Sequence, residues 1–239
     1  MDAYGAFAAI YDEWSAHMTE DVPFYVELAR EADGPVVELA VGNGRVAIPV
    51  ARETGKAVIG IDRSPAMLAQ ARERAEAAGV ELILRELDMR DFELEEPAAL
   101  VYCPFRALLH LPTWDDRRRV FERVAAALRP GGRFVWNAFV FDPLIAAGLS
   151  GEVREHGEGS RLWEQVEYVP GDSRIDITVW VGEPGEGERK LSLWWVNRSE
   201  WEGLIDVAAL EVEALYGDFD RTPFDDESRE FIWVARKPA

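Results

Sequence analysis

One stretch decides the fold, and it reads Val36-Val37-Glu38-Leu39-Ala40-Val41-Gly42-Asn43-Gly44-Arg45. An apolar run enters a turn of small residues, and a mostly apolar segment, 46–51, follows it, so the pattern predicts a strand, a tight turn and the start of a helix. Glycine lets a backbone approach a ligand closely, and a helix N-terminus offers unpaired N–H groups and the positive end of a dipole. We therefore expect a ligand at this turn.

Asp62 adds a polar group at the same place. It ends the next apolar run, 57–61, and in a parallel sheet its carboxylate would lie beside the first turn. A carboxylate in that position accepts hydrogen bonds from a ribose diol. The two features together predict a site for a cofactor that contains a nucleoside.

Strand and helix patterns alternate through the first 140 residues. Strands are expected at 36–40, 57–61, 81–86, 98–102 and 133–140. Helices are expected between them at 45–53, 64–78 and 113–128, with caps at Gly55, Ser64, Gly79 and Thr113. Alternating elements with short connections predict an α/β fold with a doubly wound, mostly parallel sheet, whose ligands lie at the carboxyl ends of the strands.

The first 30 residues predict two helices. Apolar side chains at spacings of three and four define the first helix: Tyr4, Phe7, Ile10, Tyr11 and Trp14. The second helix follows Pro23. These helices either pack on the body of the fold or form a flap over a ligand, and the flap is the alternative that concerns Tyr11 and Trp14.

The last 90 residues predict an insertion and then the end of the sheet. Residues 150–160 are rich in Gly, Glu and Ser and predict a mobile loop. Strands are expected at 161–169, 174–181, 189–197, 210–216 and 230–236. We interpret 150–198 as a small antiparallel β insertion within a single domain that spans 1–239. Ser199-Glu200-Trp201-Glu202 predicts a capping box that opens a helix.

Composition restricts the possible partners and the location. The chain has 239 residues, of which 45 are acidic and 26 basic, and a net charge of -19 makes nucleic acid and anionic membranes poor partners. Cys103 is the one cysteine, and the histidines are scattered at His17, His110 and His156, which argues against a metal site. No signal peptide and no apolar run of ~20 residues is apparent, so we expect a cytoplasmic protein.

The glycine turn fits two known patterns. Residues 42–47 match the dinucleotide fingerprint G-x-G-x-x-G/A, and Asp62 lies 20 residues beyond Gly42, which is typical of a NAD(P)-dependent oxidoreductase. Residues 38–44 match E/D-x-G-x-G-x-G, a pattern of the class I S-adenosylmethionine-dependent methyltransferases, which this chain resembles.

Three further features favour the methyltransferase. Asp88-Met89 follows the third strand, where the family places an acid that bonds the adenine amino group and then a residue beside the ring. Residues 128–134 look like the family's L-x-P-G-G turn before its fifth strand. The ending, 216–237, is similar to that of bacterial small-molecule members. The resemblance implies a seven-stranded sheet with the last strand antiparallel, S-adenosylmethionine as cofactor, and methyl transfer to N or O of a small-molecule acceptor.

The resemblance also implies a set of cofactor-binding residues. They are Tyr11, Trp14, Glu38, Ala40, Gly42, Gly44, Asp62, Arg63, Asp88 and Met89. Glu38 either solvates a strand end or lies near the methionine amino group. Ala40 departs from the family, which usually has glycine there. The alanine methyl group costs little if the backbone φ is negative and strains the turn if φ is positive.

Acceptor residues are expected between Cys103 and His110. Cys103 itself is predicted to be a buried small residue. Arg106 either clamps an acceptor carboxylate or phosphate or pairs with a surface acid. His110 is either a general base, because its unperturbed pKa of ~6.5 suits that task, or a residue that orients a loop. The insertion's tryptophans either build its own core or wall an acceptor pocket: Trp163, Trp180, Trp194 and Trp195. A NAD(P)-dependent oxidoreductase and a non-catalytic S-adenosylmethionine-binding protein remain as alternatives.

Overall fold

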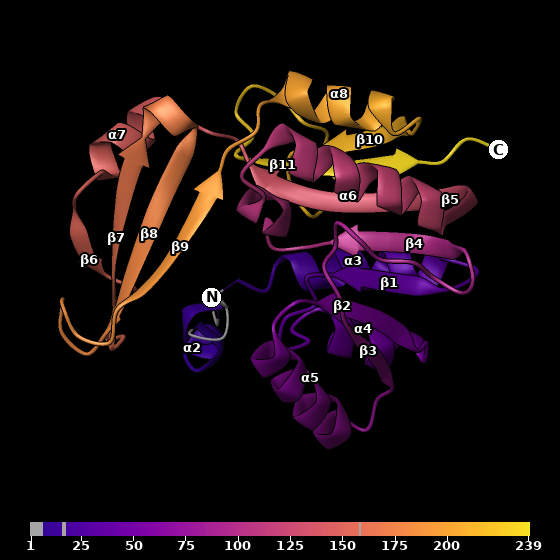
Figure 1. Cartoon of the computed structure of the whole chain (residues 1–239), viewed down its shortest axis with the longest axis horizontal. Coiled ribbons are helices and arrows are strands. Elements are labelled where there is room, and N and C mark those ends of the chain that lie inside the picture. Colours follow the sequence, from indigo (N-terminus) through magenta and orange to yellow (C-terminus); the bar gives the residue numbers. More distant parts are fainter. Residues whose placement is uncertain (1–6, 16–17, 158) are drawn as a thin grey trace.

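The main sheet has seven strands in a computed structural model that describes residues 7–15, 18–157 and 159–239 (Figure 1). Their order across the sheet is β10 (Glu211–Tyr216), β11 (Glu230–Arg236), β5 (Leu128–Phe139), β4 (Ala98–Cys103), β1 (Val36–Leu39), β2 (Val58–Asp62) and β3 (Leu82–Glu86). The neighbours β5, β4, β1, β2 and β3 pair in parallel, whereas β11 is antiparallel to both β5 and β10. The predicted seven-stranded, mostly parallel sheet with an antiparallel last strand is confirmed.

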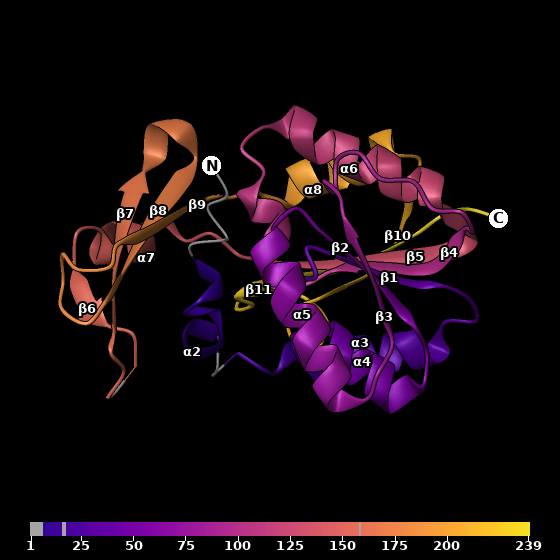
Figure 2. The same cartoon turned by 60° about the horizontal axis from the view of Figure 1, so that its bottom comes forward.

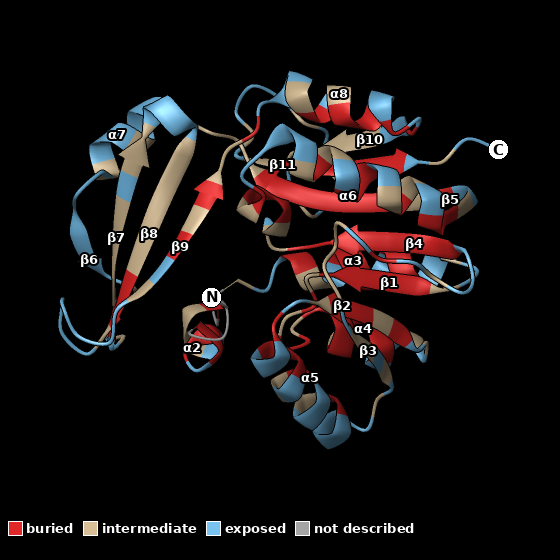
Figure 3. Cartoon of the chain, viewed as in Figure 1, coloured by how far each residue is buried: buried red, intermediate tan, exposed pale blue. Residues whose placement is uncertain are grey.

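Helices cover both faces of this sheet, so it is buried between two helical layers (Figures 2 and 3). One layer contains α3 (Asp21–Glu31), α4 (Ala47–Thr54) and α5 (Pro65–Ala78), and the other contains α6 (Trp114–Ala127) and α8 (Arg198–Val207). Successive strand residues point to opposite faces. In β5, Trp136 therefore packs with Phe121 of α6, whereas Val135 belongs to the core beneath α3 and α4. The long apolar strand runs of the sequence reflect this two-sided burial.

Local signals place most helix ends correctly. The Ser64 side chain accepts a hydrogen bond from the Met67 amide, Thr113 accepts one from the Asp116 amide, and Gly55 ends α4 in the left-handed conformation. The predicted capping box at 199–202 is wrong, because Asn197 caps α8 by accepting a hydrogen bond from the Glu200 amide.

A second, four-stranded antiparallel sheet stands beside the main one (Figure 1). Its strands are β6 (Val153–Glu155), β7 (Leu162–Val169), β8 (Arg174–Val181) and β9 (Arg189–Trp194). The predicted loop at 150–160 therefore contains β6. Helix α7 (Pro143–Leu149) was not predicted, and Asp142 caps it by accepting hydrogen bonds from the Leu144 and Ile145 amides. The short 3₁₀ helices are η1 (Ala107–His110) and η2 (Pro170–Asp172).

Helix α2 (Tyr11–Ser15) lies between the two sheets (Figure 1). It is shorter than the helix predicted over residues 4–14, because residues 9 and 10 form a turn, and Tyr4 and His17 lie outside the described residues. Among the residues that the structure describes, no helix has the length and apolar character that crossing a bilayer requires. The same residues hold no cluster of three His, Cys, Asp or Glu side chains suited to a metal ion.

Candidate active site

A cavity of about 840 Å³ opens between the carboxyl edge of the main sheet and the second sheet. Pockets for small molecules and cofactors commonly have this size. The main sheet contributes residues from the turns after its strands: Ala40, Gly42, Asp62, Arg63, Leu87, Asp88 and Met89. The second sheet contributes mainly apolar side chains: Val166, Ile175, Ile177, Leu191, Leu193 and Trp194. Tyr11 and Trp14 reach the same cavity from α2.

Asp62 is held at the cavity wall by two backbone amides. Its Oδ2 accepts a hydrogen bond from the Gly42 amide at 2.8 Å, and its Oδ1 accepts one from the Ser64 amide at 2.8 Å. Gly42 has a φ of 54°, which is the conformation that glycine adopts without steric cost. The turn after β1 and the end of β2 are thus locked together, as their adjacent parallel strands led us to expect.

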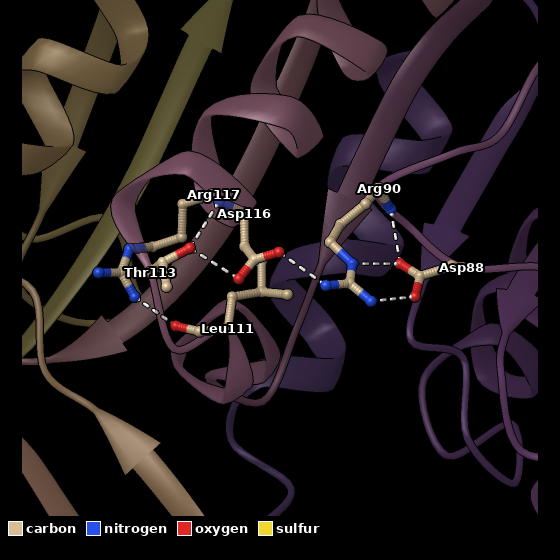
Figure 4. Close-up of polar contacts among 6 residues, drawn as sticks. All are labelled: Asp88, Arg90, Leu111, Thr113, Asp116 and Arg117. Carbon is tan, nitrogen blue, oxygen red and sulfur yellow. Dashed lines mark hydrogen bonds and ion pairs between the residues drawn. The ribbon is translucent and has the colours of Figure 1, made fainter.

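Asp88 belongs to a charged network that links β3 to α6 (Figure 4). The Arg90 guanidinium donates to both Asp88 oxygens, from Nε at 2.9 Å and from Nη2 at 2.7 Å, and its Nη1 donates to Asp116 at 2.6 Å. Asp116 lies in the first turn of α6, where Thr113 donates to its carboxylate. The hydrogen bonds from Arg90 hold the pKa of Asp88 below its usual value, so this carboxyl stays ionised at the cavity wall.

Glu38 and Gly44 are placed differently from the other expected cofactor residues, because the described cavity lining does not include them. Glu38 is 2% exposed, and desolvation raises the pKa of its carboxyl to about 8, so it is largely protonated at neutral pH. Gly44 has a φ of 82°, and a Cβ there would lie 2.9 Å from the Ile48 side chain. The packing of α4 therefore accounts for this glycine.

Ala40 lines the cavity and has a φ of 54°. This is the positive value for which the alanine methyl group strains the turn, at a cost of about 1–2 kcal/mol. Ala40 thus carries a side chain on a left-handed backbone that glycine would adopt without this cost.

Arg106 and His110 both line the cavity, on the segment that follows β4. Arg106 donates to Glu230 of β11 at 2.8 Å, with 44% of its side chain exposed. His110 is nearer the second sheet, and its Nδ1 lies 3.2 Å from the Ser192 carbonyl oxygen. Burial lowers the pKa of His110 to about 4, so the ring is neutral at neutral pH and a weak base. Cys103 is fully buried, as expected.

Comparison with known proteins decides between the two readings of the glycine turn. Residues 36–132 match the Methyltransferase domain family. The chain is 33% identical over 212 residues to a dTDP-4-amino-2,3,4,6-tetradeoxy-D-glucose N,N-dimethyltransferase from Saccharopolyspora spinosa, which covers 86% of this chain and 82% of that protein. This chain belongs to the S-adenosylmethionine-dependent methyltransferases. The oxidoreductase alternative finds no support.

Two further similarities cover nearly the whole methyltransferase. It is 29% identical over 246 residues to the 27-O-demethylrifamycin SV methyltransferase of Amycolatopsis mediterranei, a match that spans 97% of this chain and 86% of the relative. The structure of the CcbJ methyltransferase from Streptomyces caelestis superposes with a TM-score of 0.86 at 27% identity and covers 99% of this chain and 98% of that one. The methyltransferase thus acts on small molecules and uses S-adenosylmethionine.

The chain's own residues fit this cofactor. Asp62 and the ionised Asp88 present hydrogen-bond acceptors at the ends of adjacent strands. Two backbone amides fix Asp62, each at 2.8 Å. The cavity beside these two carboxylates continues to the second sheet. A bound nucleoside offers the matching donors, its ribose hydroxyls and adenine amino group. The methyltransferase therefore has room for a donor at the main sheet and an acceptor beyond it.

Four side chains around α2 complete the cavity, and sequence reasoning found two of them. The Trp14 ring lies edge-on to Phe105 at 5.8 Å and stacks on His156 at 6.0 Å, while Tyr11 meets Phe105 at 6.0 Å. Packing on the fold and forming a flap over a ligand were the alternatives for Tyr11 and Trp14: both side chains pack on the core and line the cavity, and the flap stays a prediction. Phe105 has a φ of 58°, which no sequence spacing reveals. Of the insertion's tryptophans, Trp194 reaches the cavity.

Proposed function

We propose that this methyltransferase transfers a methyl group to the nitrogen of a small amine whose body packs on the second sheet. S-adenosylmethionine supplies that methyl group on a sulfonium, which makes the transfer an in-line displacement that depends on alignment. The observation that carries the proposal is the weak basicity of His110 and Glu164, two titratable side chains in the acceptor half of the cavity.

An amine and a hydroxyl make different demands on such a cavity. A hydroxyl needs a base to take its proton as it attacks, whereas a neutral amine attacks with its own lone pair and can lose a proton afterwards. Burial holds the pKa of His110 at about 4. The pKa of Glu164 is lowered because its ion pairs with His156 and Arg154 outweigh burial. Both groups are poor bases at neutral pH, so the cavity favours an acceptor that needs no base.

We assign the methyl donor, S-adenosylmethionine, to the main-sheet wall. Asp62 accepts from the ribose, Asp88 from the adenine amino group, and Met89 lies beside the ring. The remaining proposed contacts of the methyl donor are Tyr11, Trp14, Ala40, Gly42 and Arg63, whereas Glu38 and Gly44, which the sequence also predicted, support this wall from behind. His110 and Arg106 face the acceptor, where they position it and exclude water.

The charges of the cavity favour a free amine over a nucleotide-linked one. Among the described lining residues, four of the five arginine and lysine side chains already form ion pairs, namely Arg90, Arg106, Arg154 and Lys190, and the fifth, Arg63, belongs to the proposed methyl-donor wall. A diphosphate would have to compete with these acids, in a chain of net charge -19. The cytoplasm, a reducing compartment, suits the single cysteine and is where we place the reaction.

The test is a competition between matched acceptors. Purified enzyme is given methyl-labelled S-adenosylmethionine and pairs of small molecules that differ in one group, amine against hydroxyl, and free amino sugar against its dTDP-linked form. We expect labelled N-methyl product from free amines at least tenfold faster than from the alcohols. Faster methylation of the alcohols would refute the nitrogen assignment, and preference for the dTDP-linked sugar would refute the free acceptor.

A further inference from the structure

Helix α2 bridges the two sheets over the cavity. On the main-sheet side, Asp12 accepts hydrogen bonds from Asn43 at 2.7 Å and from Arg74 at 2.5 Å. On the second-sheet side, Glu13 pairs with Arg161 at 2.8 Å. Because α2 carries Tyr11 and Trp14 into the cavity, whatever holds α2 also sets one wall of the site.

His156 makes the other link from the second sheet to α2, and its geometry defines its protonation state. Its Nδ1 lies 2.8 Å from Glu164 Oε2, and its Nε2 lies 2.8 Å from the Trp14 carbonyl oxygen. An ionised carboxylate and a carbonyl oxygen only accept hydrogen bonds, whereas neutral imidazole has a single N–H. Only the imidazolium satisfies both contacts. With 8% of the side chain exposed, bulk water has little access to replace either one.

The charges around His156 favour that cation. Glu164 on β7 contacts the ring, and Arg154 on β6 pairs with the same carboxylate at 2.7 Å and opposes the charge on the ring. On α2 and just before β7, Glu13 and Arg161 neutralise each other. The hydrogen bond to Glu164 raises the pKa of His156 above its ordinary value, against the effect of burial and of Arg154.

We propose that His156 is a positioning residue: its imidazolium latches α2 to the second sheet over the cavity, and loss of one proton releases that latch. The latch follows from the contacts of the chain alone. Its effect on catalysis rests on the proposed placement of donor and acceptor in the cavity, where Trp14 and Tyr11 would shift when α2 loosens.

The direction of the pH dependence follows from the raised pKa. A group whose pKa is higher in the docked state stabilises docking fully below its free value, ~6.5 for histidine. That stabilisation disappears as the pH rises through the docked pKa. We therefore expect α2 to be docked in mildly acid and neutral solution and to loosen in mildly alkaline solution.

Two measurements on the intact chain test the latch. Nitrogen NMR of the ring nitrogens reports protonation directly, and the signal of His156 is assigned by its loss in His156→Gln, because the chain has three histidines. Hydrogen exchange of residues 7–15 between pH 6 and 9, corrected for intrinsic rates, reports docking. In the wild type we expect a doubly protonated ring at pH 6 and about tenfold faster corrected exchange at pH 9, the change typical of losing one hydrogen bond to a charged group.

Matched variants separate the latch from general loosening. His156→Gln should exchange fast at every pH, and Glu164→Gln should move the transition to lower pH. Arg161→Gln breaks the other link from the second sheet to α2 and leaves His156 and Glu164 in place, so it should speed exchange at every pH and keep the pH transition. A neutral ring at pH 6, a flat wild-type profile, or a midpoint lost in Arg161→Gln would overturn the proposal.

A binding measurement keeps this inference apart from the proposed function. If the wild type shows the pH-dependent exchange but binds no S-adenosylhomocysteine, the latch stands and the proposed donor site fails. If it binds S-adenosylhomocysteine and the exchange profile is flat, the latch fails alone. If the wild type shows both the pH-dependent exchange and the binding, its kcat for an amine substrate should fall as the pH rises, with the same midpoint as the exchange. This fall in kcat should be absent in His156→Gln.

Discussion

The main-sheet wall of the cavity carries its polar groups at strand ends, whereas the second-sheet wall presents mainly apolar side chains from strand interiors. Asp62 is fixed by two backbone amides and Asp88 by the Arg90 guanidinium. Opposite them, Ile175 and Ile177 of β8 share one face of an antiparallel sheet. The first wall defines hydrogen-bond positions, and the second defines a shape.

This difference separates what each half of the site can recognise. Fixed acceptors discriminate between ligands by their donors, because an unmatched buried polar group costs ~1–3 kcal/mol. Apolar walls discriminate by volume at roughly 0.8 kcal/mol for each buried methylene, so they change specificity easily. We therefore expect donor binding to depend on single polar atoms, and acceptor binding to depend on side-chain size.

The largest expected effect concerns Glu38, which lies beneath the main-sheet wall. Because burial raises the pKa of Glu38 to about 8, its contribution to stability is fully present below the unfolded-state value and is lost as pH rises through about 8. Glu38→Gln keeps the shape without the proton. Between pH 5 and 8 the variant should gain roughly 3 kcal/mol in free energy of unfolding relative to the wild type, measured by urea denaturation.

A control and a second measurement sharpen this result. Glu86→Gln makes the same change at an exposed position of β3. The difference in free energy of unfolding between this variant and the wild type should be the same at every pH. If the difference between Glu38→Gln and the wild type also stayed the same at every pH, Glu38 would be ionised in the folded protein. Loss of donor affinity in Glu38→Gln would place Glu38 among the groups that contact the donor.

Asp62 is expected to have the next largest effect, on donor binding. In the proposed site, Asp62→Ala removes a hydrogen bond between a charged group and the ribose, and it leaves the Gly42 amide without its partner. We expect the affinity for S-adenosylhomocysteine, measured by calorimetry, to fall by roughly 1.5–3 kcal/mol. Asp62→Asn, which retains one acceptor oxygen, should lose less. Unchanged affinity in both variants would show that the ribose lies elsewhere.

The sequence predicted many residues of the main-sheet wall because each follows a short apolar run that local patterns identify as a strand. The strand before Gly42, the strand before Asp62 and the strand before Asp88 are short apolar runs, and parallel strands bring such ends to one edge. Caps such as Ser64 depend on a few neighbouring residues. The prediction of a capping box at 199–202 is wrong because such local signals can compete: Asn197, two residues before Ser199, caps the helix instead.

The contacts that complete the site escaped prediction because they join distant positions. Arg90 and Asp116 are 26 residues apart, and His156 and Trp14 are 142 residues apart, so no spacing in the chain signals either pair. Helix α7 lacks a buried stripe, with Leu144 83% exposed, although Asp142-Pro143 was a readable start signal. The sign of φ at Ala40 depends on how β1 meets β2, which the sequence left open.

The second-sheet wall should respond to side-chain volume. Ile177→Ala shortens an apolar side chain that lines the cavity, and we expect kcat/KM for a methylated amine to fall about tenfold, from the loss of roughly 1–1.5 kcal/mol of apolar contact. Affinity for S-adenosylhomocysteine should not change. Val153→Ala removes apolar surface from an exposed position of the same sheet and should leave both quantities as they are. If Ile177→Ala lowered the affinity for S-adenosylhomocysteine, the second-sheet wall would also contact the methyl donor, and the two walls would not have separate roles.

The smallest expected effect lies at Ala40, where the polar wall meets a strained backbone. Its φ of 54° is unfavourable for alanine, so Ala40→Gly should raise the free energy of unfolding by about 1 kcal/mol, measured by urea denaturation. Ala209 has a φ of 53° between α8 and β10, outside the described cavity lining, and Ala209→Gly should stabilise the fold equally.

The comparison of these two glycine variants isolates what the Ala40 methyl group does to the donor. Both relieve the same backbone strain, so any difference in affinity for S-adenosylhomocysteine comes from the cavity. If the methyl group narrows the donor site, Ala40→Gly should bind more tightly while Ala209→Gly binds as the wild type does. If neither affinity changes, the donor lies clear of the methyl group, and the strain at Ala40 affects stability alone. Destabilisation by Ala40→Gly would instead show that contacts of the methyl group outweigh the conformational cost of its left-handed backbone.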